Sequence, residues 1–87
     1  MMKRQKEEIY QTIGHRIAYF RKQKHWTQQE LADRIYRNVS VISRVEQGKY
    51  NSGLSLGLLV DIVNALQIRL FVLFLMEDDR LFLSEYR

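Results

Sequence analysis

Residues 27–48 have the sequence TQQELADRIYRNVSVISRVEQG, which contains two signals for the start of a helix and one for a helix end. Thr27 and Glu30 have the spacing of a capping box, in which each side chain can hydrogen-bond the backbone N–H of the other residue. Asn38 is a favoured N-cap residue, and Gly48 is a favoured residue just beyond the C-terminus of a helix. The stretch therefore predicts two short helices.

The first predicted helix covers about residues 28–35 and the second about residues 39–47, with residues 36–38 between them. Two short helices joined by a tight break have the geometry of a helix-turn-helix, whose second helix enters the major groove of DNA. Helical spacing predicts which apolar residues face the core. These are Leu31, Ala32 and Ile35 in the first helix, and Ile42 and Val45 in the second. Helix pairs of this kind also occur without DNA binding, so geometry alone leaves the function open.

Helical segments also flank this pair. The apolar residues Ile9, Ile13, Ile17 and Phe20 share one helical face and predict a helix over about residues 6–24. Gly14 lies inside this helix, where glycine costs about 1 kcal/mol relative to alanine. Gly14 indicates either a close packing neighbour at this position or a place where the fold tolerates lower helix stability.

Ser55 is the expected N-cap of a helix over about residues 56–66. Its predicted inward residues are Leu56, Leu59, Ile62, Val63 and Leu66. The apolar segment 68–76 fits a helix or a strand, and we favour a helix. The expected fold is therefore all-α, with five helices in a single domain over residues 1–87.

The chain has a formal net charge of +4 and a pI of about 9.6, which favours a polyanionic partner such as nucleic acid. Residues 1–24 contribute seven Lys and Arg against two Glu. The chain has no cysteine, which excludes disulfides and thiolate metal sites and is consistent with a cytoplasmic protein. No signal peptide is expected, because no apolar run follows the basic start, and no apolar run approaches the roughly 20 residues of a membrane span.

Several parts of the sequence together resemble the phage-repressor type of helix-turn-helix, the Xre/Cro-like family. The matching strings are IG-RI (13–17), FRKQK (20–24), WTQQELA (26–32) and ISRVEQGK (42–49), followed by Leu59, Ile62, Ala65, Leu66, Leu70, Leu73 and Phe74. The resemblance covers about residues 9–76. It implies a five-helix, lambda-repressor-like domain with a short C-terminal extension, in a bacterial or phage regulator that binds a palindromic operator as a homodimer and acts as a repressor or autoregulator.

Two features depart from the family pattern. Tyr36 stands at the turn position that the family often fills with glycine, and a left-handed backbone would strain a tyrosine, so we expect a different turn. The loop 49–55 is about two residues longer than usual by comparison with the family pattern, which leaves its phosphate contacts in question.

The outward residues of the second helix are the candidates for contacts with DNA bases. With Ile42 and Val45 inward, these are Val39, Ser40, Ser43 and Arg44. A guanidinium can pair with both acceptors of guanine, the serine hydroxyls can bond base edges or phosphate, and valine can contact a thymine methyl.

The resemblance also implies contacts with phosphates and one structural ion pair. The candidate phosphate-binding residues are Gln28, Asn38, Lys49, Tyr50 and Asn51, with Arg16, Lys22 and Arg37 as further cations that are as well explained by solvated surface. The matching family positions imply a partly buried pair between Arg21 and Glu46, and a second role for Gln28 in bracing the recognition helix.

The C-terminal segment 67–87 is the expected dimerisation region. Family-like core positions are Leu70, Leu73 and Phe74. The side chains of Phe71, Val72 and Leu75 would then form an exposed apolar patch, which typically marks an interface. A two-fold dimer through a helix is favoured; an intermolecular strand ribbon, or a tail over residues 80–86 that covers the patch, are the alternatives.

An enzyme is not expected, and neither is a metal or a cofactor. His15 and His25 have no cysteine or paired acidic ligand nearby in the sequence. The remaining alternatives share the same DNA-binding head: an antitoxin whose C-terminal region binds a toxin, or a restriction–modification controller. Binding to a membrane surface is disfavoured by the acidic residues 77–79, which anionic lipids would repel.

Overall fold

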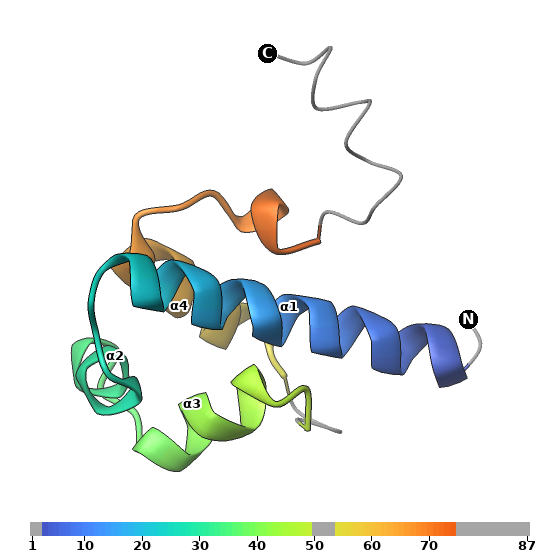
Figure 1. Cartoon of the computed structure of the whole chain (residues 1–87), viewed down its shortest axis with the longest axis horizontal. Helices are drawn as coiled ribbons and strands as arrows, with labels where there is room; N and C mark the ends of the chain where they lie inside the picture. The colour runs from blue at the N-terminus through green and yellow to red at the C-terminus, as the bar shows by residue number, and fades with distance from the viewer. Residues whose placement is uncertain (1–2, 50–53, 75–87) are drawn as a thin grey trace, which may run out of the picture.

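The computed structural model describes residues 3–49 and 54–74, and every regular element in this part of the chain is a helix (Figure 1). The elements are α1 (Lys3–Gln23), α2 (Gln28–Arg34), α3 (Val39–Glu46), α4 (Leu56–Leu66) and the 3₁₀ helix η1 (Leu70–Phe74). The predicted all-α fold is confirmed. Helix α1 begins three residues earlier than predicted. Within the described ranges, no helix is long and apolar enough to cross a membrane.

All three predicted N-caps are formed. The Thr27 hydroxyl accepts from the Glu30 backbone N–H at 3.0 Å, and the Glu30 carboxylate accepts from the Thr27 N–H at 2.8 Å. Asn38 accepts from the backbone of Ser40 at 2.9 Å. Ser55 accepts from Leu58 in the same way at 3.1 Å. The sequence therefore determines the starts of α2, α3 and α4 locally, through side chains that satisfy the first free N–H groups.

The four α-helices also end alike, each with one residue in the left-handed region. These residues are His25, Tyr36, Gly48 and Gln67, with φ of 61°, 58°, 70° and 60°. The residue after each donates its N–H to the carbonyl five positions earlier, as from Arg37 to Ala32 at 3.0 Å. The expectation of a different turn at Tyr36 is wrong. Its side chain is 93% exposed, so it clashes with nothing, and the turn keeps its usual geometry despite a strain of about 1–2 kcal/mol.

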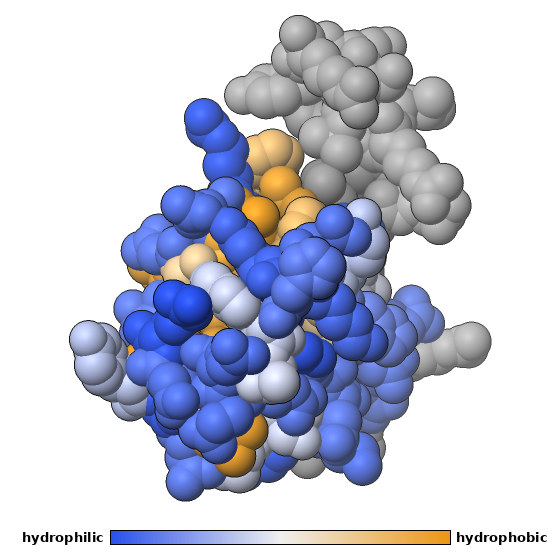
Figure 2. All heavy atoms as spheres, turned by 60° about the vertical axis from the view of Figure 1, so that its left-hand side comes forward, coloured by the Kyte–Doolittle hydropathy of each residue, from blue (hydrophilic) through white to orange (hydrophobic). Residues whose placement is uncertain are grey.

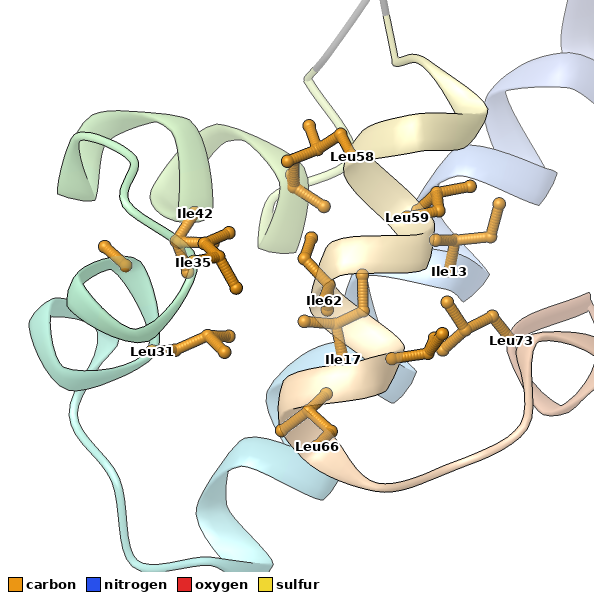
Figure 3. Packing of buried hydrophobic residues seen from close by; sticks show 13 residues of the cluster. Ile13, Ile17, Leu31, Ile35, Ile42, Leu58, Leu59, Ile62, Leu66 and Leu73 are labelled. Atoms are coloured by element: carbon orange, nitrogen blue, oxygen red, sulfur yellow. The ribbon is translucent and has the colours of Figure 1, made fainter.

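The core lies where the four α-helices and η1 converge, as Figure 3 shows. Its α1 members are Ile13 and Ile17, which pack among residues of every later element. The other members are Leu31, Ala32, Ile35, Ile42, Val45, Leu58, Leu59, Ile62, Val63, Leu66 and Leu73. Leu56, predicted to face inward, is 63% exposed, because it lies at the first position of α4, at the edge of the buried stripe that begins with Leu58.

The C-terminal element differs from the prediction. Residues 70–74 form a 3₁₀ helix instead of the α-helix expected over 68–76, of which 75 and 76 lie outside the described residues. A 3₁₀ helix has three residues per turn, so residues three apart share a side. Leu70 and Leu73 therefore pack on the core, while Phe71 and Phe74 share the outer side and are 44% and 41% exposed. Phe74, predicted as a core residue, is thus placed outward by this geometry.

Helix α1 passes so close to the end of α3 that only glycine fits at the crossing. A Cβ on Gly14 would lie 2.3 Å from the Val45 carbonyl oxygen and 2.7 Å from that of Glu46. Both neighbours are backbone atoms, which cannot move without shifting a helix. Of the two explanations for Gly14, the close neighbour is the one observed.

Gly14→Ala should therefore destabilise the protein by about 1–3 kcal/mol, because overpacking outweighs the gain of about 1 kcal/mol in helix propensity. Gly57→Ala in α4 is the matched control, since the nearest atom to its added Cβ would be the Ser55 Oγ at 3.9 Å. The control should be neutral or stabilising. Urea unfolding followed by far-UV circular dichroism measures both, and equal effects would contradict the crossing argument.

Candidate nucleic-acid interface

Helix α3 packs against the core through one side and exposes its other side to solvent. Ile42 and Val45 are 0% and 2% exposed and belong to the core. Ser40 and Arg44 are exposed and Ser43 is half-buried, on the opposite side of the helix. At spacings of three and one, these polar side chains form a single stripe.

Gln47 extends this stripe, and the sequence prediction did not include it. It is exposed at the C-cap of α3, and its Nε2 donates to the Ser43 Oγ at 3.2 Å. Its position four residues after Ser43 and three after Arg44 is the signal that would have found it. The sequence analysis placed Gln47 only at the end of the predicted helix and did not consider its spacing from Ser43 and Arg44.

Val39 does not belong to this stripe. It was predicted to point outward, yet it is half-buried and packs against the core cluster. Helices α2 and α3 pack against each other after the tight turn, and Val39 stands at the first position of α3. The expected contact of Val39 with a thymine methyl stays a prediction.

A buried network fixes the end of α3 to α1 and α2. The Arg21 guanidinium donates from Nε to Glu46 Oε2 at 2.7 Å and from Nη2 to Oε1 at 2.9 Å. Its Nη1 donates to the Trp26 carbonyl at 2.7 Å. Both charged residues are only 8% exposed. The expected Arg21–Glu46 pair is thus formed, in the two-pronged geometry that suits arginine and a carboxylate.

Gln28 completes the network from α2. Its Nε2 donates to Glu46 Oε1 at 3.0 Å, so the carboxylate receives hydrogen bonds from two other helices. The hydrogen bond with Glu46 raises the pKa of the Arg21 guanidinium above its ordinary value. No buried side-chain N or O atom in the described residues lacks a partner. This network sets the position of α3 relative to the rest of the domain.

The other predicted phosphate contacts are placed as follows. Asn38 is an exposed N-cap, and Lys49 is exposed just after α3. Tyr50 and Asn51 lie outside the described residues. The Arg37 guanidinium lies 3.6 Å from the Asp61 carboxylate at the surface, and Arg16 donates to the Val72 carbonyl.

Comparison with known proteins identifies the family. A family model described as helix-turn-helix matches residues 17–73, which is more than half of the chain. The chain belongs to the helix-turn-helix family. The resemblance to the phage-repressor type is confirmed, and the family match supports a DNA-binding regulator. No curated protein matches this helix-turn-helix protein.

A solved structure agrees with this assignment. The helix-turn-helix protein is similar to the crystal structure of a hypothetical transcription factor, NHTF, from Neisseria, with a TM-score of 0.77 and 26% sequence identity. The similarity covers 90% of this chain and 87% of the Neisseria chain, so it includes nearly the whole of both proteins.

The predicted dimer segment of the helix-turn-helix protein exposes apolar side chains. Phe71 and Phe74 are both about two-fifths exposed on η1, and Val72 is half-buried; Leu75 lies outside the described residues. Figure 2 shows a mainly hydrophilic surface, on which hydrophobic atoms gather at the height of η1.

Within residues 3–49 and 54–74, no three His, Asp or Glu side chains group closely enough to hold a metal ion.

Arg21→Leu should destabilise the protein by about 3–5 kcal/mol, because it leaves the buried Glu46 carboxylate without its charged partner. The double variant Arg21→Leu/Glu46→Leu should lose less than Arg21→Leu alone, since it has no stranded charge. Urea unfolding measures these two variants and the single variant Glu46→Leu. A double variant that loses the sum of the two single changes would contradict this account of the network.

Proposed function

We propose that this protein is a sequence-specific regulator of transcription in the cytoplasm, which binds a palindromic DNA operator as a homodimer and acts as a repressor or autoregulator. The observation that supports it is the polar stripe of α3, held outward by a buried network at one end and apolar packing along the other side. A helix presented in this way can enter a major groove with its side chains already positioned.

Base contacts come from the exposed stripe. Arg44 carries the planar donor group that pairs with the O6 and N7 of guanine. Ser40 and Ser43 can donate to or accept from base edges, and Gln47 lies next to Ser43 at the end of the helix. Val39 is half-buried against the core, so its proposed contact with a thymine methyl would use only the exposed part of the side chain.

Phosphate contacts come from residues around the two helices. The Gln28 amide nitrogen has two N–H groups, so one can donate to Glu46 and the other to a phosphate. Asn38, Lys49, Tyr50 and Asn51 complete the proposed set. These contacts position the protein on DNA, while the α3 stripe supplies the sequence preference.

The homodimer supplies two recognition helices for the two half-sites of a palindrome, whose centres lie about 34 Å apart. Phe71 and Phe74 on η1 are the described apolar side chains of the proposed interface, and Leu75 follows them in the sequence. An isologous contact is proposed, because a two-fold interface matches the symmetry of the operator.

An antitoxin or a restriction–modification controller is the second candidate, favoured by the same apolar surface at Phe71 and Phe74. An antitoxin would bind its toxin there and still repress its own operon through α3. Native mass spectrometry of the protein expressed with its genetic neighbours separates the cases. A second polypeptide in the complex indicates an antitoxin, and a homodimer alone indicates a repressor or controller.

Selection from random duplex DNA followed by sequencing tests the proposed function directly, since it should return an inverted repeat. On that sequence, Arg44→Ala should lose about 1–3 kcal/mol of discrimination at one base pair per half-site. Lys49→Ala is the control, which should weaken binding to all sequences uniformly. If Arg44→Ala weakens binding to specific and to non-specific DNA equally, Arg44 contacts only phosphate and does not read a base.

Phe71→Lys should yield monomers at concentrations where the wild type is dimeric, because a charge at the centre of an apolar interface is desolvated without a partner. Val60→Lys, at a partly exposed position on α4, is the matched control and should leave the dimer intact. Analytical ultracentrifugation measures both. A dimer unchanged by Phe71→Lys would refute the η1 interface.

A further inference from the structure

Arg16 on α1 is bound to the C-terminal 3₁₀ helix instead of pointing to solvent. Its Nη1 donates to the Val72 carbonyl oxygen at 3.0 Å, and the bond is partly buried. The two residues are 56 positions apart in the sequence, so this bond joins opposite ends of the described chain. From the sequence alone, Arg16 is expected to contact a phosphate or to be a solvated cation.

Val72 is the middle residue of η1, Leu70–Phe74. Its own N–H donates to Arg69 at 3.1 Å, at the start of the turn. The Arg16 guanidinium supplies a charged donor to the Val72 carbonyl from another helix. Arg16 therefore ties the middle of η1 to α1.

This hydrogen bond bears on the orientation of the exposed phenyl rings. Leu70 and Leu73 pack on the core along the inner side of η1. The hydrogen bond to Val72, the neighbour of both Phe71 and Leu73, adds a directional attachment to this apolar packing. Together the packing and the bond fix the direction in which Phe71 and Phe74 face.

The same segment of α1 is attached to the recognition helix. Ile13 and Ile17, on either side of Arg16, are buried at 2% and 0% exposure. Gly14 lies against the carbonyls at the end of α3. The five residues from Ile13 to Ile17 thus contact α3 on one side and η1 on the other.

We infer that Arg16 is a positioning residue for the dimer, which holds the Phe71 and Phe74 surface at a fixed orientation to the recognition helix without contacting DNA. The inference rests on the proposed homodimer and adds to it the residue that sets its geometry. The two recognition helices of a dimer must match a fixed half-site spacing, so a loose interface segment weakens both assembly and operator binding.

The test is Arg16→Gln, with Lys22→Gln as a control that removes the same charge from an exposed position on the same helix. Sedimentation equilibrium should show the dimer dissociation constant raised about tenfold or more in Arg16→Gln, as expected for loss of a hydrogen bond from a charged donor, and unchanged in Lys22→Gln. Arg16→Lys, which keeps a charged donor, should give an intermediate value. If circular dichroism shows that Arg16→Gln does not fold, the comparison of Arg16→Lys with the wild type carries the test.

The salt dependence of operator binding separates positioning from a phosphate contact. Measured at protein concentrations that keep each variant dimeric, the slope of log K against log salt should be the same for Arg16→Gln and wild type. A slope reduced by about 0.9 per subunit would make Arg16 a phosphate contact and overturn the inference. Equal dimer affinities in wild type and Arg16→Gln would overturn the inference about Arg16 and leave the proposed homodimer standing. A monomeric wild type would refute the homodimer itself.

Discussion

The buried pair between Arg21 and Glu46 is the constraint on which the position of the recognition helix depends. Two charges in a small apolar domain are favourable only when their hydrogen bonds are complete, and here the pair gains further partners from Trp26 and Gln28. Because these partners come from α1, from the residue before the α2 cap and from α2 itself, the end of α3 has one position in which every donor is satisfied. A displaced α3 would leave a buried charge unpaired.

The α1–α3 crossing is the place in this fold where space requires glycine. Gly14 faces the carbonyls at the end of α3, and a Cβ on Gly48 would lie 2.9 Å from the Gln11 side chain and 3.0 Å from its Cα. The other left-handed helix ends carry His25, Tyr36 and Gln67. Backbone strain alone is thus tolerated with a side chain, while strain combined with a close backbone neighbour is not.

Local signals explain most of what could be predicted from the sequence. The caps at Thr27, Asn38 and Ser55 depend on residues three apart or closer, so the sequence determines the starts of α2 to α4. The turn at Tyr36 was mispredicted because its strain was weighed without knowing that the side chain is exposed. Residues 70–74 were mispredicted because an apolar run fits a 3₁₀ helix as well as an α-helix, and the choice depends on contacts with α1.

The bond between Arg16 and Val72 shows why the roles of charged residues are the hardest part of such a site to predict. In the sequence, Arg16, Arg21 and Arg44 are alike, three arginines on helices of a basic protein. In the structure, the first donates to a carbonyl of η1, the second is buried against Glu46, and the third is exposed on α3. Net charge therefore overstates the surface available to a polyanion, because two of these three guanidinium groups hold the fold. In the proposed function, sequence preference comes from the stripe around Arg44, and the Arg21–Glu46 pair holds the helix that carries it.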